Sequence, residues 1–352
     1  MSATIVGIGL ATPGQTIAQD RVAELIARAS GANGTRARAI STLYRNSGVR
    51  SRGIASAAFH EGDLAIAQAE GTAERMRRYH ELAPPIAAHA CTTALGRAGV
   101  RPDGVTHLIT VSCTGLASPG LDIELIHRLE LPASTERVNV GFMGCHGALN
   151  GLRVARALAA SSEHAVVLLC CAELCSLHFQ GGQPEGSAVA DALFADGAAA
   201  CVVRRGGDGP AIAHSEAVLL PDSLSEMAWD VGPSGFLMTL SPRVPDLLSR
   251  HVPGWVDGLL SARGMARGDI ASWAIHPGGP RVLQRVAGAL GLDPSATEAS
   301  ADVLGQHGNM SSATILFIID RMLRAGARLP LLAMAFGPGL TGEAVLLADD
   351  AR

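Results

Sequence analysis

The segment Val140-Gly-Phe-Met-Gly-Cys-His-Gly-Ala-Leu-Asn-Gly-Leu-Arg153 connects a short β-branched run to a stretch with helical periodicity. We expect a strand over residues 137–141, a helix over 146–160 and a buried strand over 165–171. An earlier apolar run, residues 107–112, is expected to form a further strand. Strands and helices that alternate in this way are typical of an α/β fold.

The same order of elements returns near the C-terminus. There we expect a strand, a helix and a strand, over residues 272–275, 310–324 and 329–336. Cys113 and Cys145 are 32 residues apart, and His276 and Asn309 are 33 residues apart. Spacings of equivalent loops that differ by one residue predict an internally duplicated fold. The glycine-rich stretch at 204–210 is the clearest loop signal inside the chain, so we expect the boundary there and the halves to be residues 1–205 and 206–352.

Composition excludes several classes of function. The chain has 352 residues, 48% of them hydrophobic, and a net charge of −4. This supports a large core, and the absence of a basic block gives no support to nucleic acid as a partner. All 28 basic residues are arginine. Without lysine the chain cannot form a Walker P-loop, a pyridoxal Schiff base, a Ser–Lys dyad or a lysine-dependent aldolase.

The seven cysteines favour a reducing compartment. Their number is odd and the chain is long, so we expect free thiols and a cytoplasmic protein. The N-terminus reads as a first strand rather than a secretion signal, and the apolar run at 165–172 is too short to span a membrane. Cys170, Cys171 and Cys175 lack the paired spacing of a zinc site, so no metal is expected.

Cys145 is the first candidate for chemistry. It is expected between a strand and the first turn of a helix, where unpaired amides and the helix dipole stabilise a thiolate. Such positions are typical of cysteines with a lowered pKa. The alternative interpretation is a small buried apolar residue, which is what most cysteines are.

His276 and Asn309 are the second and third candidates. His276 follows a strand and precedes Pro-Gly-Gly-Pro, which suits a base or hydrogen-bond donor, although a single histidine is more often structural. Asn309 opens an expected helix, where asparagine is also an ordinary N-cap. Together with Cys145 they supply a nucleophile, an imidazole and an amide donor, the groups needed for acyl transfer through cysteine.

At these residues the chain resembles the type III polyketide synthases, the chalcone and stilbene synthase family of the thiolase superfamily. The similarity lies in Gly144-Cys145 with its following helix, in Ile275-His-Pro-Gly-Gly-Pro280, in Gly308-Asn-Met-Ser-Ser-Ala313 and in Phe336-Gly-Pro-Gly-Leu-Thr341. The family's last motif has a glycine where Ala335 stands. The similarity extends from about residue 5 to the C-terminus with the spacing preserved.

The resemblance implies a duplicated αβαβα thiolase-type fold, with two similar halves that carry mixed five-stranded sheets, and a homodimer. It implies that an acyl group from a coenzyme A thioester is loaded onto Cys145. Malonyl-CoA is then decarboxylated beside His276 and Asn309, which donate to the enolate oxygen, and the enolate attacks the cysteine-bound thioester. Repetition lengthens the chain, which then cyclises or is released. No cofactor is implied beyond the coenzyme A thioesters that serve as substrates.

The resemblance also indicates a substrate pocket with departures from plant members. Phe194 and Met238 match the positions of two gating phenylalanines, although Phe236 lies close enough to confuse the second. The other pocket residues that we assign are Cys113, Cys175, His178 and Ser311. The first three replace threonines, and a sulfur-containing wall suits an aliphatic or small acyl starter at least as well as an aromatic one.

Two further departures concern partners. Ser118 replaces a methionine that reaches across the dimer in plant enzymes. The family's lysine contacts to coenzyme A are absent, and the candidates to replace them are Arg36, Arg38 and Arg45.

Three alternatives stay open. A ketoacyl–acyl-carrier-protein synthase III shares the fold and the type of triad but usually has His-Gln-Ala-Asn in place of His-Pro-Gly-Gly. A cysteine acyl-CoA hydrolase would use the same nucleophile. A non-catalytic thiolase-fold protein that binds acyl chains would not need the triad intact.

Overall fold

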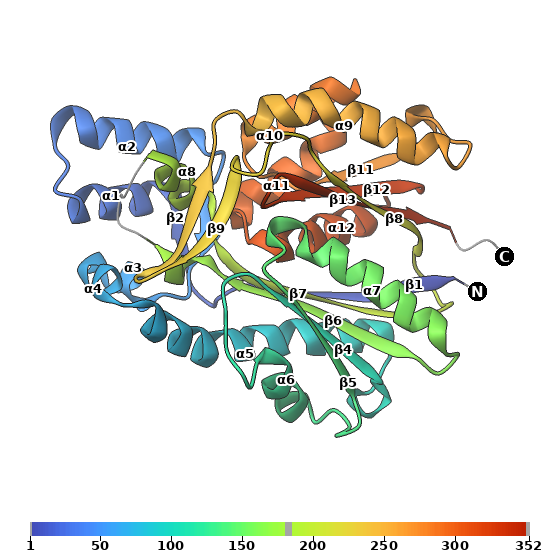
Figure 1. Ribbon diagram of the computed structural model, residues 1–352. Helices are drawn as coiled ribbons and strands as arrows, with labels where there is room; N and C mark the ends of the chain where they lie inside the picture. The colour runs from blue at the N-terminus through green and yellow to red at the C-terminus, as the bar shows by residue number, and fades with distance from the viewer. Residues whose placement is uncertain (1, 180–184, 350–352) are drawn as a thin grey trace.

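A mixed β-sheet forms the framework of the molecule, and the computed structural model describes residues 2–179 and 185–349 (Figure 1). In the described residues the main sheet has nine strands in the order β11-β12-β13-β8-β1-β7-β6-β4-β5. In chain order their bounds are Ala3–Ala11 (β1), His107–Ser112 (β4), Glu136–Gly141 (β5), Val166–Leu174 (β6), Asp196–Arg205 (β7), Ala211–Leu219 (β8), Ser272–Ile275 (β11), Leu331–Gly337 (β12) and Thr341–Ala348 (β13).

The sheet contains the same strand arrangement twice. In the first half β4 is parallel to β6, while β6, β7 and β1 follow one another antiparallel. In the second half β11 is parallel to β12, while β12, β13 and β8 are antiparallel. The halves meet where Thr4 of β1 pairs with Ala211 of β8. The predicted duplication is therefore present in the strand topology.

The two halves differ by one strand, which corrects the expectation of five strands in each. The first half adds β5 parallel to β4 at the sheet edge, whereas the described residues of the second half contribute four strands to the sheet. At the equivalent point the second half has the helix α11 (Glu298–His307), and Asn309 instead pairs with Phe194 in an isolated bridge. Half of residues 298–307 are the helix formers Ala, Glu, Leu and Gln, which is compatible with this helix.

Helices form three layers around these strands (Figure 1). Side chains of α7 (Gly147–Ser161) and α12 (Thr314–Arg324) share one core with strands of both halves. Helices α5 (Thr72–Ala98) and α6 (Leu121–Leu129) pack on the other face of the first half, and α9 (Val244–Ser261) and α10 (Pro280–Leu290) on the other face of the second. The layers therefore run helix, strand, helix, strand, helix, as expected.

Strand β6 shows why the strands sit between helical layers. Leu169 and Cys171 contribute to the core around α7, whereas Leu168 and Cys170 contribute to the core under α5. Neighbouring residues in a strand point to opposite faces, so an unbroken apolar run is buried on both sides. Helix α5 also approaches β1 very closely, since a Cβ built on Gly9 would lie 2.1 Å from the carbonyl oxygen of Ala90.

The remaining elements lie around one end of the layered core. They include the two-stranded sheets β2–β3 and β9–β10 and a group of N-terminal helices. Their bounds are Thr16–Ala18 (β2), Gln19–Ala29 (α1), Gly34–Asn46 (α2), Ser51–Gly53 (β3), Ala57–Glu61 (α3), Leu64–Ala69 (α4), Glu185–Leu193 (α8), Met227–Gly232 (β9) and Gly235–Leu240 (β10). Among the described helices, none combines the length and apolar character needed to cross a bilayer.

Candidate active site

Cys145 lies in a tight turn between β5 and α7. The turn is the 3₁₀ segment η2 (Gly144–His146), and α7 begins at Gly147 rather than at the predicted residue 146. Gly144 has a φ of 72°, and a Cβ built on it would lie 2.2 Å from Cδ of Pro338. A residue with a side chain would be strained here and would collide with a rigid ring. Glycine therefore allows the Pro338 loop to cover the cysteine.

Asn309 and Ser311 approach the Cys145 thiol from the second half. The Nδ2 of Asn309 lies 3.9 Å from Sγ of Cys145 and its Oδ1 lies 4.0 Å away. Because Oδ1 also accepts a 2.9 Å hydrogen bond from the backbone N–H of Ser311, the amide is oriented with Nδ2 free to donate toward the sulfur. Asn309 is not a helix cap, since α12 begins only at Thr314.

His276 follows directly after β11 and is 1% exposed. Its backbone N–H donates to the carbonyl oxygen of Met334, but within the described part of the chain neither ring nitrogen has a hydrogen-bond partner. Burial, with a smaller contribution from the charge of His146, lowers the pKa of His276 to about 3. His146 is the residue after Cys145 in the chain, so this electrostatic influence links His276 to the turn that carries Cys145. A buried imidazole with two open nitrogens is prepared to bind a group from outside the protein.

The Cys145 thiol differs from its expected state. Burial is the main cause that raises its pKa to about 12; hydrogen bonds from Ser311 and Asn309 oppose this rise, and the carboxyl group of Glu173 adds to it. The expectation of a lowered pKa was wrong because the cost of desolvation exceeds the effect of the nearby amides and helix dipole. The structure therefore holds a neutral thiol near a neutral imidazole.

Glu173 is an interior carboxyl group that sequence patterns did not identify as part of the site. It is fully buried at the end of β6 and accepts hydrogen bonds from the backbone N–H of Cys113 and from the hydroxyls of Thr114 and Ser312. Burial raises its pKa, and these hydrogen bonds lower it. An acidic residue inside an apolar run was the available indication, because a buried carboxyl group normally needs several donors.

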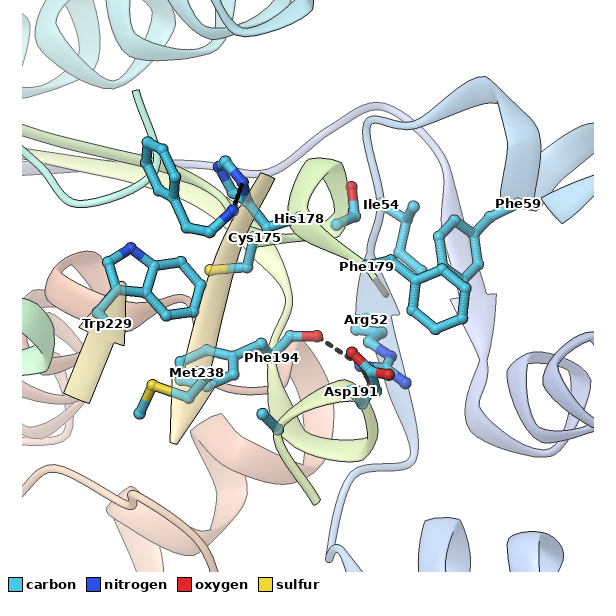
Figure 2. Close-up of a pocket in the computed structure, with 13 residues that line it drawn as sticks. Arg52, Ile54, Phe59, Cys175, His178, Phe179, Asp191, Phe194, Trp229 and Met238 are labelled. Carbon is cyan, nitrogen blue, oxygen red and sulfur yellow. Dashed lines mark hydrogen bonds between the residues drawn. The ribbon is translucent and has the colours of Figure 1, made fainter. Parts of the chain in front are cut away.

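Two adjoining cavities, one of them lined by Cys145, share Cys175, Phe194, Trp229 and Met238. The first is also lined by Cys113, Cys145 and Ser311, and the second by Arg52, His178 and Phe236. The six residues assigned to the pocket from the sequence therefore line one or both cavities. Figure 2 shows Phe194, Met238 and Trp229 lying near one another around the second cavity.

The hairpin β9–β10 contributes Trp229, Phe236 and Met238. The Trp229 Nε1–H donates to the carbonyl oxygen of Cys113 at 2.7 Å. His178 stacks on Phe236 with ring centroids 4.2 Å apart, and its Nδ1 accepts from the backbone N–H of Phe236. Both candidates for the second gating position, Phe236 and Met238, lie in β10 and line the pocket. Trp229 was missed, since its role depends on contacts more than 100 residues away.

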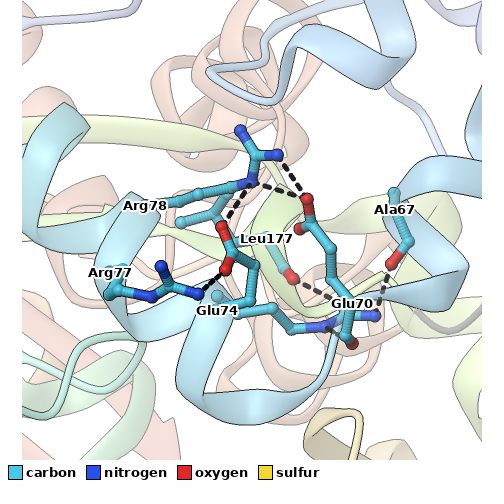
Figure 3. Close-up of polar contacts among 7 residues, drawn as sticks. Ala67, Glu70, Glu74, Arg77, Arg78 and Leu177 are labelled. Atoms are coloured by element: carbon cyan, nitrogen blue, oxygen red, sulfur yellow. Dashed lines mark hydrogen bonds and ion pairs between the residues drawn. The ribbon is translucent and has the colours of Figure 1, made fainter.

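Hydrogen bonds from a residue of α5 hold the part of the pocket wall that carries Cys175 and His178. These residues bound the 3₁₀ turn η3 (Cys175–His178), and Arg75 of α5 donates to the carbonyl oxygens of Leu177 and Phe179 next to it. Arg75 also donates to carbonyl oxygens of Ala67 and Glu70. Figure 3 shows the contacts to Ala67, Glu70 and Leu177 beside the ion pairs of Glu70 and Glu74 with Arg77 and Arg78.

A separate cavity of about 460 Å³ lies next to the histidine segment. It is largely apolar and is lined by residues of α2, α8 and the start of α10, including Gly278, Gly279 and Arg281. Its size falls in the range of ligand pockets, which is ~300–1,000 Å³. Arg36, Arg38 and Arg45 are exposed on α2, whose residues Leu43 and Asn46 line the same cavity.

Comparison with known families gives matches over nearly the whole chain. A family model described as "Chalcone and stilbene synthases, N-terminal domain" matches residues 1–209, and one described as the C-terminal domain matches residues 211–349.

Individual proteins match at similar coverage. The 1,3,6,8-tetrahydroxynaphthalene synthase of Streptomyces peucetius subsp. caesius is 34% identical over 98% of this chain and 92% of its own length. Probable polyketide synthase 1 of Dictyostelium discoideum is 29% identical over 98% of this chain, which spans only 11% of that relative. The crystal structure of the C-terminal type III polyketide synthase domain of Steely1, a type I/III hybrid from Dictyostelium, superposes with a TM-score of 0.92 and 28% identity, covering 99% of each chain.

Proposed function

Because the chain belongs to the chalcone and stilbene synthase family, the type III polyketide synthases, we propose that it condenses acyl groups from coenzyme A thioesters on Cys145. One observation carries the proposal. The thiol of Cys145 and the amide of Asn309, from opposite halves, lie within 4 Å of each other, and the buried His276, with two open ring nitrogens, is influenced electrostatically by His146, the residue after Cys145. We take residues 1–205 and 206–352 as the two halves that contribute these groups.

The loading step begins from the neutral pair. A starter acyl-CoA enters, His276 takes the proton of the Cys145 thiol, and the sulfur attacks the thioester carbonyl. The proton leaves with the coenzyme A thiol, so the products are an acyl-enzyme and neutral His276. Formation of the thiolate is costly in the buried site, and the nearby imidazole lowers that cost once it becomes a cation.

The extension step needs donors rather than a strong base. Loss of CO₂ from a bound malonyl thioester leaves its electron pair on an enolate, so no C–H proton has to be removed. The Nδ2–H of Asn309 and an N–H of His276 would donate to the enolate oxygen, and donors are most effective in a site that excludes water. The enolate carbon then attacks the carbonyl carbon of the Cys145 thioester and releases the Cys145 thiolate. The acyl chain, now two carbons longer, is carried by coenzyme A.

The cavities support a small or aliphatic starter. The space beside Cys145 is enclosed by Trp229, Phe194 and Met238, with thiols of Cys113 and Cys175 on its wall. The separate cavity beside Gly278 and Gly279 suits the pantetheine arm, and Arg281 together with the α2 arginines would meet the phosphates.

The homodimer is a further part of the proposal. Strand β5 ends the described sheet, and just beyond it Phe142 and Met143 are each 42% exposed, while Leu116 on the neighbouring loop is 55% exposed. Exposed large apolar side chains beside an unpaired strand edge favour contact with a second copy. The seven free thiols are all buried, which fits a reducing compartment such as the cytoplasm.

Incubation of the protein with malonyl-CoA and a panel of acyl-CoAs, read by product mass, tests the proposal. We expect Cys145→Ala to lose condensation, while Cys91→Ala, which removes a thiol from the core under α5, keeps it. A Cys145→Ala protein that still builds diketides would show that the nucleophile is assigned wrongly. Free acid released from acyl-CoA without consumption of malonyl-CoA would favour a hydrolase, and condensation only with a carrier-bound partner would favour a ketoacyl synthase.

Decarboxylation of malonyl-CoA tests the donors separately. We expect His276→Ala and Asn309→Ala each to slow it by ~10²-fold or more, as loss of an oxyanion donor does. Near-normal rates in both variants would remove these residues from the reaction.

A further inference from the structure

A chain of buried hydrogen bonds connects the nucleophile turn to the loop that covers it. His146, next to Cys145, is 4% exposed, and its Nδ1 lies 2.6 Å from Oδ1 of Asn150. The Nδ2–H of Asn150 donates to Glu343 at 2.7 Å, and Glu343 also accepts from Arg153 at 3.0 Å. These contacts join η2 and α7 of the first half to β13 of the second half.

The other ring nitrogen of His146 faces the covering loop. Its Nε2 lies 2.6 Å from Oγ1 of Thr341, and Oγ1 also lies 3.1 Å from the carbonyl oxygen of Pro338. The ring packs against Gly337, where an added Cβ would lie 2.5 Å from the imidazole. Pro338 in turn lies against Gly144 and lines the cavity at Cys145.

The order of donors fixes the proton positions along this chain. Glu343, paired with Arg153, accepts from Asn150, so the Oδ1 of Asn150 faces His146 and the Nδ1 must carry a proton. In the neutral imidazole Nε2 is then an acceptor, and the hydroxyl of Thr341 donates to it. In the cation Nε2–H donates to Thr341, whose own proton is then free to bond the carbonyl oxygen of Pro338.

We propose that His146 is a positioning residue that connects its own protonation to the loop Gly337-Pro338-Gly339 over Cys145 through the hydroxyl of Thr341. This inference rests on the proposed function for its catalytic meaning. A proton from solvent binds the lone pair of Nε2 and forms its N–H bond, no bond between heavy atoms changes, and one hydroxyl turns from His146 to Pro338.

The charge on His146 also acts on the reacting groups. The titratable and charged groups around it are His276 at the end of β11, Glu343 on β13, Arg153 on α7 and the adjoining Cys145. Burial lowers the pKa of His146, while the contact with Asn150 raises it. Protonation therefore occurs below the ordinary pKa of about 6.5 and stabilises the Cys145 thiolate.

The first test follows iodoacetamide alkylation of Cys145 in the full chain from pH 5 to pH 9. In the wild type we expect the logarithm of the rate to rise with pH at less than unit slope over the range, below pH 6.5, in which His146 loses its proton. The cation favours the thiolate, so its loss offsets part of the gain in thiolate that rising pH brings. In His146→Phe, which keeps a ring but cannot be protonated, we expect unit slope throughout. The same change of slope in the pH profiles of the wild type and His146→Phe would overturn the proposal.

The second test does not depend on replacing the buried ring. Thr341→Val removes the hydroxyl at constant shape, and Thr341→Ser restores it. We expect Thr341→Val to lower kcat for malonyl-CoA decarboxylation at least fivefold with a smaller change in KM, and Thr341→Ser to recover most of the loss. Equal rates in the two variants would reject the role of the hydroxyl.

The two proposals fail in different ways. A wild-type protein that shows the change of slope in alkylation but no condensation with any acyl-CoA would reject the proposed function and keep the coupling of His146 to Cys145. A wild-type protein that condenses but shows unit slope would reject the coupling alone.

Discussion

The backbone at Gly144 decides whether Cys145 can be covered by a loop from the other half of the molecule. Glycine is needed there for two independent reasons, a φ of 72° and the close approach of the Pro338 ring. We expect Gly144→Ala to destabilise the protein by about 2 kcal/mol or more, because the left-handed backbone alone costs ~1–2 kcal/mol for a residue with a Cβ. Urea unfolding measures this loss, and faster alkylation of Cys145 would show that the loop is displaced.

A glycine in open space provides the control for this prediction. Gly254 lies inside α9, and a Cβ built on it meets nothing within 4 Å. Gly254→Ala should therefore stabilise the protein by ~0.5–1 kcal/mol, since alanine loses less backbone freedom on folding. If Gly144→Ala were as well tolerated as Gly254→Ala, the turn would not depend on glycine.

Individual residues also show what a sequence can reveal about a reactive group. The spacing around Cys145, His276 and Asn309 and their resemblance to a family were sufficient to propose them as the reacting groups. The ionisation state of the thiol was not predictable, because it depends on burial by residues from the other half and on Glu173. Position at a helix start predicts a thiolate only when water or a cation remains nearby.

At the scale of elements, the 3₁₀ turn η3 depends on one arginine of α5. Arg75 is 1% exposed and donates to backbone carbonyl oxygens of Ala67, Glu70, Leu177 and Phe179. Arg75→Met keeps much of the apolar stem but leaves these acceptors without their donor. We expect a loss of about 3–5 kcal/mol in the free energy of urea unfolding, since each unsatisfied buried group costs ~1–3 kcal/mol and some acceptors would recover water.

Arg77 is the matched control on the same helix. It pairs with Glu74 at the surface (Figure 3), with its side chain 71% exposed. Exposed pairs of this kind contribute ~0–1 kcal/mol, so Arg77→Met should be close to neutral. Similar losses in the two variants would mean that α5 itself, rather than the contacts of Arg75 with η3, was damaged.

Elements with regular periodicity were predictable, and elements that depend on distant partners were not. The strands at 107–112 and 272–275 were placed correctly, and β5, β6 and β12 nearly so. The helix starts expected at 146 and 310 were early, because both helices are preceded by a 3₁₀ turn that holds a site residue in non-helical geometry. The hairpin β9–β10 was missed because it lies outside the main sheet and is held by Cys113, His178 and Thr72.

At the scale of the whole molecule, the duplication was recognisable from spacing alone. Cys145 and Asn309 occupy equivalent positions in the two halves, and the structure brings them within 4 Å of each other. The difference of one strand was not predictable from spacing, because a helix and a strand can span similar stretches of chain between the same two loops. Residues 298–307 form α11, which leaves Asn309 to pair with Phe194 of the first half. The asymmetry thus brings a site residue of one half into contact with the pocket wall of the other.

The buried state of His276 should be visible in the stability of the whole molecule. Its pKa is about 3 in the folded protein and near 6.5 when unfolded, so the unfolded chain binds the additional proton between these values. Its contribution to stability is complete above pH 6.5 and is lost as pH falls toward 3. Between pH 7.5 and pH 5.0 this loss amounts to about 2 kcal/mol, at 1.36 kcal/mol for each pH unit below 6.5.

The variant His276→Gln lacks this pH-dependent loss, so its free energy of unfolding relative to the wild type should rise by that amount on acidification. At pH 7.5 the difference in unfolding free energy between the two proteins measures the cost of repacking around the substituted side chain. The titration of groups that both proteins share cancels in the comparison between the two pH values. An unchanged difference at the two pH values would mean that the imidazole is already charged, or reached by water, in the folded protein.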